Sequence, residues 1–251
     1  WGMTREESIR YAYDHDIPIQ ATKEKLYSID DNLWGRAIEC GEMEDPWAVP
    51  PPGVWLLTRQ TATEPADVVV AFHEGVPVAL DDVEMDMPAM VARLNELVGS
   101  YGWGRIDMVE NRRVGIKSRE TYECPASLAL MMAHADLESI CLERDLQREK
   151  SRLEPRYAEL IYDGLWFSPL KQALDAFVDQ SQSHVTGEAR LHVSPGSCQV
   201  TGRRSPHSLY DYGLATYDAA DSFRHEDSEG FVRLWGLGIE TWASMQGTTP
   251  S

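Results

Sequence analysis

Apolar residues cluster in short β-branched runs at two places in this chain, and each place predicts a hairpin. Residues 66–72 and 76–80 are such runs, separated by a turn that ends at Gly75. Residues 190–194 and 198–202 are the second pair, joined by a short Pro-Gly turn. Both patterns are typical of antiparallel strands that follow one another directly.

Polar residues interrupt two less regular segments. Residues 105–109 and 113–117 are short strand candidates on either side of a polar tripeptide, residues 110–112. The glycine-rich residues 99–104 before them are expected to form a turn. Residues 25–40 open with a string of polar side chains and are therefore expected to start as a loop.

Elsewhere, apolar residues recur every three or four positions, which predicts helices. The first helix is expected to begin after Thr4, which starts a capping-box pattern. A second helix is predicted at residues 85–99. A long helical region is predicted from residue 125 to residue 162, interrupted near Pro155, and a further helix is predicted to begin after Ser168.

The tail from Asp227 onward is predicted to be an amphipathic helix with many large apolar residues. Such a surface either docks on a partner subunit or packs on its own domain, and the sequence favours neither. Hairpins mixed with helices, without regular strand-helix alternation, predict the α+β class. We expect a mixed or antiparallel sheet with packed helices, followed by this C-terminal helix.

The charge balance narrows the classes of partner. The 251 residues include 23 basic and 41 acidic side chains, and the net charge of −18 repels nucleic acids and anionic lipids. No apolar run approaches the roughly 20 residues that span a bilayer, and no secretory signal is visible. A cytoplasmic protein without nucleic-acid or membrane partners is expected. Four widely spaced cysteines favour reduced thiols over a zinc site or a disulfide framework.

The sequence lacks a P-loop, a G-x-G-x-x-G turn, a G-x-S-x-G elbow and an H-E-x-x-H pair, so no catalytic or metal residue is assigned. Three polar stretches remain as candidates for a binding site. The first is YSIDDNLWGR at residues 27–36. Its side chains could hydrogen-bond a small zwitterion, or Ser28 or Asp30 could cap a helix.

The second stretch covers residues 102–125. Its carboxylate Glu110 could pair with a ligand ammonium and Tyr122 could hydrogen-bond the ligand, or the charges could form surface ion pairs on a hairpin. The third stretch, residues 202–211, places two arginines before Ser-Pro. That pattern fits either a phosphate contact or a structured turn with an interface role.

Five strings in this chain resemble the argininosuccinate synthase family, and they occur in the family's order over nearly the whole length. A single string of this kind would be weak, whereas five in one order are specific. The strings are YSIDDNLWGR, GRIDMVENR, GIKSR, YAELIYDGLWFSP and GRRSP, at residues 27–36, 104–112, 115–119, 157–169 and 202–206.

The resemblance implies a ligase that joins citrulline to aspartate and uses ATP, with magnesium, as co-substrate. In the family, the citrulline ureido oxygen attacks the α-phosphate of ATP, and the aspartate amine then displaces AMP. ATP is held mainly by an amino-terminal domain whose serine- and glycine-rich loop is not in this sequence. A homotetramer is also implied. Residues 1–24 would end that domain or link from it, residues 25–226 would form the synthetase domain, and residues 227–251 would form the oligomerisation helix and tail.

By position, the resemblance assigns citrulline contacts to Ser28, Ala37, Glu110 and Tyr122. They would position the substrate, with no nucleophile or general base among them. Three residues depart from the family pattern: Ala37 replaces a serine, Glu120 replaces a glycine and Cys124 replaces a threonine. These departures keep a second hypothesis open, a divergent non-catalytic paralogue or fragment that acts as an oligomerisation or amino-acid-binding module.

Overall fold

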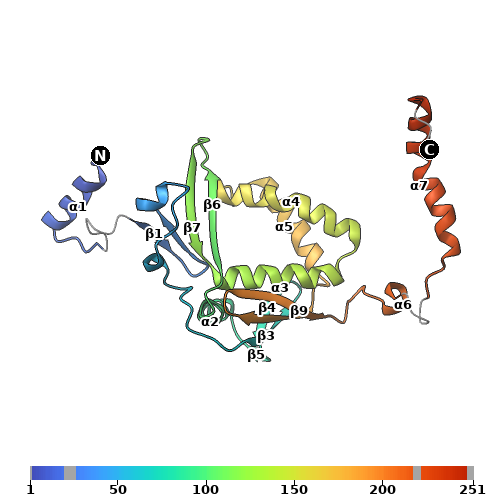
Figure 1. Cartoon of the computed structure of the whole chain (residues 1–251), viewed down its shortest axis with the longest axis horizontal. Helices are drawn as coiled ribbons and strands as arrows, with labels where there is room; N and C mark the ends of the chain where they lie inside the picture. The colour runs from blue at the N-terminus through green and yellow to red at the C-terminus, as the bar shows by residue number, and fades with distance from the viewer. Residues whose placement is uncertain (1, 20–26, 217–221, 248–251) are drawn as a thin grey trace. The chain divides into compact units, whose positions relative to one another are not determined.

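The computed structural model describes residues 2–19, 27–216 and 222–247, and the chain divides into two compact units, Trp1–Ser208 and Leu209–Ser251. The first unit contains two antiparallel sheets with helices packed against them (Figure 1). Hairpins mixed with helices confirm the predicted α+β class. Within the described ranges, no helix is both long enough and apolar enough to cross a bilayer.

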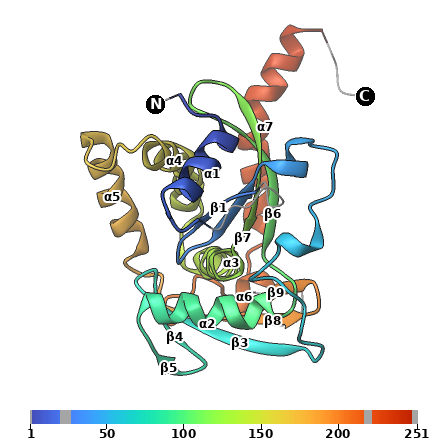
Figure 2. The same cartoon turned by 90° about the vertical axis from the view of Figure 1, so that its left-hand side faces the viewer.

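A five-stranded sheet forms the base of the first unit, with strand order β5-β4-β3-β8-β9. Both hairpins predicted from β-branched runs are confirmed, β3 with β4 and β8 with β9. Helices α2 and α3 lie side by side on one face of this sheet and close the main core (Figure 2). The bounds are β3 Ala66–His73, β4 Val76–Leu80, β5 Val83–Glu84, β8 Gly187–Ser194, β9 Ser197–Arg204, α2 Met87–Gly99 and α3 Pro125–Cys141.

A second, four-stranded sheet has the order β1-β2-β7-β6, and every neighbouring pair is antiparallel. The β6–β7 hairpin rises from the N-terminal end of α3 (Figure 1). Hairpin β1–β2 adds to β7 from an earlier part of the chain. The bounds are β1 Ser28–Asp31, β2 Arg36–Glu39, β6 Arg105–Asn111 and β7 Lys117–Glu123.

Two expectations for this sheet were wrong. Most of the polar string expected to be a loop lies in β1, which begins at Ser28, while residues 25 and 26 lie outside the described residues. The turn to β2 is closed by the Asn32 side chain, which accepts hydrogen bonds from Trp34 N and Gly35 N at 2.8 and 3.1 Å. The strand predicted at residues 113–117 is mostly turn, and β7 begins only at Lys117. Gly115 adopts φ +83° in that turn, a conformation that glycine permits and a continuous strand does not.

The helices follow their predicted patterns with one correction. Helix α1 (Arg5–Asp14) has the expected capping box, and α5 (Pro169–Gln182) begins after Ser168. The long helical region breaks before α4 (Arg144–Tyr162), where Glu143 caps the new helix, and Pro155 lies inside α4. The predicted interruption near Pro155 is therefore wrong. Two short 3-10 helices, Gly41–Glu44 and Pro52–Val54, lie on the connection between the sheets.

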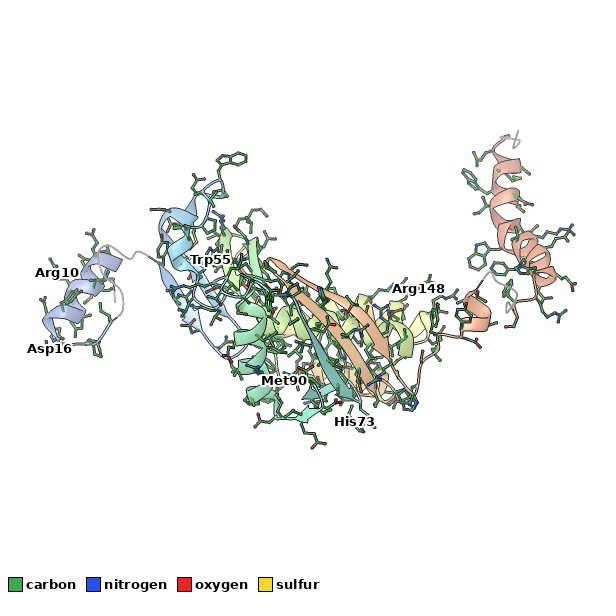
Figure 3. All side chains as sticks on the ribbon, turned by 60° about the horizontal axis from the view of Figure 1, so that its bottom comes forward. Arg10, Asp16, Trp55, His73, Met90 and Arg148 are labelled. Carbon is green, nitrogen blue, oxygen red and sulfur yellow. The ribbon has the colours of Figure 1, made fainter. Side chains whose placement is uncertain are left out.

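The second unit contains α6 (Tyr212–Ala215) and α7 (Glu226–Met245), which confirms the predicted tail helix. None of the residues in α7 is buried in this chain. Figure 3 shows its side chains projecting from the ribbon, whereas Met90 of α2 lies in the interior of the first unit.

Two glycines are required where the end of α2 and the start of β6 pass close to the start of α3 and to the connecting loop. A Cβ on Gly104, where φ is +107°, would lie 2.3 Å from Pro125 Cα. A Cβ on Gly99 would lie 2.1 Å from the carbonyl oxygen of Leu57. Real side chains do not approach so closely, so this contact fixes where α2, the connecting loop and α3 meet.

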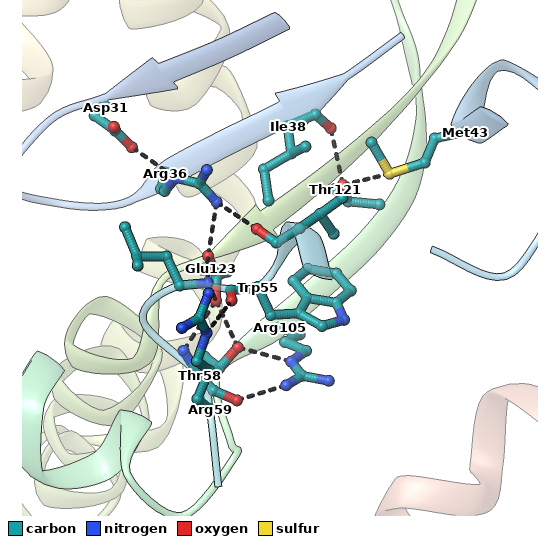
Figure 4. A network of polar contacts seen from close by, with 12 residues as sticks. Asp31, Arg36, Ile38, Met43, Trp55, Thr58, Arg59, Arg105, Thr121 and Glu123 are labelled. Atoms are coloured by element: carbon teal, nitrogen blue, oxygen red, sulfur yellow. Dashed lines mark hydrogen bonds and ion pairs between the residues drawn. The ribbon is translucent and has the colours of Figure 1, made fainter. Parts of the chain in front are cut away.

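A buried carboxylate holds the connecting loop against this junction. Glu123, at 0% exposure, accepts hydrogen bonds from Leu56 N at 2.9 Å and from both the backbone N and the hydroxyl of Thr58 at 2.9 and 2.7 Å (Figure 4). Arg36 Nη1 from β2 lies 3.0 Å from the same carboxylate. Arg105 Nε from β6 donates to the Thr58 hydroxyl at 2.7 Å. One charge thus joins three strands to the loop.

Replacing this carboxylate should cost more than replacing any surface charge. We expect Glu123→Ala to lower the free energy of unfolding by about 3–5 kcal/mol, because it leaves the Arg36 guanidinium and two loop N–H groups buried without their partner. Urea unfolding followed by circular dichroism measures the change.

Glu149→Ala is the matched control, since Glu149 pairs with Arg152 on the exposed surface of α4. Its effect should stay within about 0.5 kcal/mol. Equal losses for the two variants would contradict the structural role assigned to Glu123.

Candidate functional site

The four residues expected to contact an amino acid lie on four different strands of the four-stranded sheet. Ser28 is on β1, Ala37 on β2, Glu110 on β6 and Tyr122 on β7. Because Ser28 and Asp30 lie in a strand, the alternative that one of them caps a helix is wrong.

The strand register places these residues on the same face. Residues directly opposite each other in antiparallel strands share a face, as do residues two apart on one strand. Ala37 lies opposite Tyr122. Ser28 lies opposite Glu39, two residues from Ala37. On the neighbouring strand β6, Glu110 lies opposite Ser118, which is on the same face of β7 as Tyr122.

The same face carries three carboxylates around one guanidinium. Arg112, in the β6–β7 turn, places Nη2 3.1 Å from Glu39 Oε2 and 3.6 Å from Glu120 Oε1. Its Nε lies 3.8 Å from Glu110 Oε1 and donates to the Ser118 hydroxyl at 3.0 Å. With all three carboxylates ionised, the cluster has a net charge of −2, which suits a cationic group and repels phosphate.

Ser118 connects two of these carboxylates. Its hydroxyl lies 3.2 Å from Glu110 Oε1 and 3.4 Å from Glu120 Oε1, and it donates to one of them at a time. The Ser118 hydroxyl oxygen also accepts a hydrogen bond from Arg112 Nε. The hydroxyl and the guanidinium therefore hold the cluster together at the turn end of the hairpin.

The electrostatics of this face alter two titrations. Burial of Glu120, followed by its hydrogen bond and repulsion with Glu39 and the charge of Glu110, raises its pKa to about 7. Burial, followed by the negative charges of the same cluster, raises the pKa of Tyr122 to about 12. Tyr122 therefore stays a neutral hydroxyl that can both donate and accept a hydrogen bond.

The opposite face of the β6–β7 hairpin carries the surface ion pair considered as an alternative. Arg119 pairs with Asp107 at 2.5 Å and donates to the backbone oxygens of Asp45 and Ala48 at 2.8 and 2.7 Å. The hydrogen bonds to Arg119 lower the pKa of Asp107. Ion pairs thus lie on both faces of this hairpin, around Arg112 on one face and between Arg119 and Asp107 on the other. The ligand contacts of Glu110 and Tyr122 stay a prediction.

The arginines of the third polar stretch are already paired. Arg203 forms two hydrogen bonds to Asp136 of α3, at 2.5 and 2.7 Å, and Arg204 pairs with Glu188 of β8 at 2.6 Å. The Ser205 hydroxyl accepts a hydrogen bond from His207 N at 2.9 Å, as in a structured turn. These contacts favour the turn over a phosphate site.

Residues capable of metal binding do not gather in the described part of the chain: no group of three His, Cys, Asp or Glu side chains there could hold an ion. The four cysteines are free thiols. Burial raises the pKa of Cys198 to about 11 and also raises that of Cys124, so neither is activated as a nucleophile.

The sequence interpretation gave no role to Glu39, Arg112 or Ser118. The signal for Ser118 was present, because Ser118, Glu120 and Tyr122 alternate with period two along β7. Glu39 could not be found in this way, since its position depends on the pairing of β2 with a strand about 80 residues later.

Comparison with known proteins gives one consistent family. Residues 27–242 match the family described as Arginosuccinate synthase C-terminal domain. The chain is 49% identical over 237 residues to the argininosuccinate synthase of Dictyoglomus thermophilum, covering 94% of this chain and 60% of that protein. It is 50% identical over 248 residues to that of Synechococcus sp., covering 98% and 62%.

A third relative, the argininosuccinate synthase of Thermosynechococcus vestitus, is 50% identical over 246 residues, which cover 97% of this chain and 61% of the relative. The chain thus spans about three fifths of the length of the curated relatives it matches. The family resemblance of the five strings is confirmed, and the chain belongs to the argininosuccinate synthase family, whose C-terminal domain it carries.

Proposed function

We propose that this chain is part of an enzyme that joins citrulline and aspartate into argininosuccinate, with ATP converted to AMP and pyrophosphate. The polar face of its four-stranded sheet supplies part of the citrulline site. The observation that carries the proposal is the register, which brings Ser28, Ala37, Glu110 and Tyr122 from four strands to one face. Family membership supplies the reaction class.

The residues on this face suit the amino-acid end of citrulline. Glu110 is 20% exposed and carries a charge opposite to that of the α-ammonium. Tyr122, kept protonated by its raised pKa, can donate to the ligand's carboxylate or accept from its ammonium, and Ser28 adds a second hydroxyl. Fixing this end of the substrate orients the distant ureido oxygen, so the contribution of the chain to the reaction is positioning.

ATP and its magnesium ion belong elsewhere in the proposed enzyme. Three carboxylates and one guanidinium repel a triphosphate, and the paired Arg203 and Arg204 are not free to bind it. We therefore assign ATP, and most contacts to aspartate, to the part of the family fold that this chain does not cover.

A homotetramer in the cytoplasm, with α7 supplying subunit contacts, completes the proposal. The large apolar side chains of α7 are exposed along its length, and Phe231 stacks on Trp235 with ring centroids 5.4 Å apart. A helix with this much exposed apolar surface suits an interface. The division into residues 1–24, 25–226 and 227–251 stays a prediction. That α7 packs on a partner subunit, and not on its own domain, is likewise a prediction.

A non-catalytic amino-acid-binding or oligomerisation module is the second candidate. Ala37 supports it, because the methyl group opposite Tyr122 cannot supply the hydroxyl that the family has there. Glu120 supports it too, because it adds a third carboxylate to a face that the family builds with glycine at that position.

Turnover separates these candidates. In the full-length protein we expect AMP to form only when citrulline and aspartate are both present. Glu110→Gln should weaken citrulline binding by about tenfold, because a charge-assisted contact of ~1.5 kcal/mol or more is lost. Isothermal titration calorimetry and an AMP-release assay measure the two effects.

Glu188→Gln provides the control, since Glu188 pairs with Arg204 on the other sheet. Ala37→Ser is a variant with the opposite effect: it should tighten citrulline binding by about fivefold, because one hydrogen bond is restored. Citrulline binding without any AMP formation would favour the module, and the absence of binding would refute both the site and its proposed ligand.

The role of α7 predicts a change of assembly. Leu234→Glu together with Trp242→Glu should reduce the tetramer to smaller species, because charges are depleted from the core of protein interfaces. Size-exclusion chromatography with light scattering gives the mass directly. Both side chains are exposed in this chain, at 76% and 64%.

The matched control on the same helix is Glu240→Gln, which removes a charge at an exposed position of α7. It should leave the assembly unchanged. An unchanged mass for the double variant, with a lower melting temperature instead, would mean that α7 packs on its own domain.

A further inference from the structure

The guanidinium of Arg112 lies at unequal distances from the three carboxylates around it. Its Nη2 donates to Glu39 at 3.1 Å and lies 3.6 Å from Glu120, and its Nε lies 3.8 Å from Glu110, so only Glu39 is within hydrogen-bond range. The Nε proton goes instead to the Ser118 hydroxyl at 3.0 Å. The guanidinium is thus drawn toward the Glu39 and Glu120 side of the cluster.

Glu110 keeps open acceptor positions as a result. A carboxylate has about four lone-pair sites, and the contacts of Glu110 in this cluster are the Ser118 hydroxyl at 3.2 Å and the longer approach of Arg112. An arginine with no competing carboxylate would form a bidentate pair with Glu110. That pair would occupy the sites that an ammonium group needs.

Glu39 is the nearer competitor for the guanidinium, at 3.1 Å, and a second competitor at 3.6 Å is Glu120. Glu120 lies on β7 between Ser118 and Tyr122, opposite Met108, and only 6% of its surface is exposed. Its ionised carboxylate draws Arg112 away from Glu110 and adds a second net negative charge to the cluster. When it is protonated, the cluster has a net charge of −1 in place of −2, and the attraction on a cation at Glu110 weakens.

We propose that Glu120 is a positioning residue for the amino-acid site: it retains Arg112 beside Glu39 and thereby leaves Glu110 open to the ammonium group of the ligand. The inference rests on the proposed function, because it concerns the strength of binding at the same face. It assigns to this chain a device for tuning affinity at a position where the family resemblance expects glycine.

The device has a definite pH dependence. Because the pKa of Glu120 is raised to about 7, the carboxylate is largely ionised at pH 8 and largely protonated at pH 6. Affinity for the ligand's ammonium should therefore fall as the pH falls through 7. The charged groups that act on Glu120 are Glu39 of β2, Glu110 of β6 and Arg112 of the turn. Its neighbour Tyr122 on β7 is in turn influenced by the three carboxylates and by Tyr162 of α4.

Stability responds with the opposite sign. A carboxyl group whose pKa is higher in the folded state than in the unfolded state stabilises the fold at low pH, and this contribution is lost as the pH rises through the folded pKa. The melting temperature of the wild-type protein should therefore fall between pH 5 and pH 8 by an amount that Glu120→Gln removes. The variant should melt higher than the wild-type protein at pH 8, so weaker binding cannot be attributed to unfolding.

The test titrates citrulline into the full-length protein by calorimetry at pH 6, 7 and 8. Wild-type affinity should be about fivefold weaker at pH 6 than at pH 8, the effect of about 1 kcal/mol from one partly screened charge. Glu120→Gln should show the weak affinity at every pH. Glu188→Gln, the remote control, should keep the wild-type profile.

A second pair of variants tests the role of the guanidinium. The positive charge of Arg112 lowers the pKa of Glu120, so Arg112→Gln should move the midpoint of the affinity profile to higher pH. Arg113→Gln is the control from the same turn, since Arg113 pairs with Asp163, the residue that follows α4, at 3.1 Å. It should leave the midpoint in place.

The outcomes separate this inference from the function on which it rests. If citrulline binds and Glu120→Gln keeps the wild-type pH profile, or binds more tightly at pH 8, the positioning role is overturned and the proposed site stands. If the wild-type protein binds no citrulline at any pH, the proposed function is overturned and this inference falls with it.

Discussion

The first unit depends on one buried negative charge, the carboxylate of Glu123 at the end of β7. Carboxylates are rarely buried completely, because the loss of hydration costs several kcal/mol unless partners replace the water. Here the partners come from two other segments, β2 with Arg36 and the connecting loop with Leu56 and Thr58, and Arg105 of β6 supports that loop in turn. The next residues begin α3, which packs on the five-stranded sheet. The same point in the chain therefore fixes the four-stranded sheet, the loop and the start of the main core helix.

The alternation of side chains along β7 separates structural contacts on one face from the proposed binding residues on the other. The side chains of Arg119, Thr121 and Glu123 point to the face covered by the loop, where they hold backbone oxygens, Ile38 O and the loop amides. The intervening Ser118, Glu120 and Tyr122 point to the other face, beside Glu110 and Glu39. A rigid anchor on one face lets the other face carry charged groups in fixed positions, as a binding site requires.

That second face is held at a cost to stability. Three carboxylates share one guanidinium, and Glu120 has a raised pKa because its burial and its neighbours oppose ionisation. The arrangement would be more stable with Glu120 neutral, whereas the proposed attraction of an ammonium group requires it ionised. Folding and binding thus favour opposite protonation states of the same residue, a conflict commonly found at functional sites.

The sequence by itself determined the elements that have a hydrophobic contrast. Both β-branched hairpins, the capping box of α1, helix α2, helix α5 and the tail helix follow from local periodicity, as does the α+β class, and the five strings gave the family. Only the tertiary structure decided the β1–β2 hairpin and the register of the four-stranded sheet. The sequence predicts the strand at residues 105–109, but the short β1 and β2 segments carry too few apolar residues for a clear strand pattern, and the pairing of each strand is set by contacts far along the chain. The grouping of Glu39, Arg112 and Glu120 was equally invisible, because it requires strands about 80 residues apart to pair, and such pairing is fixed by the packing around Glu123 and not by any nearby residue.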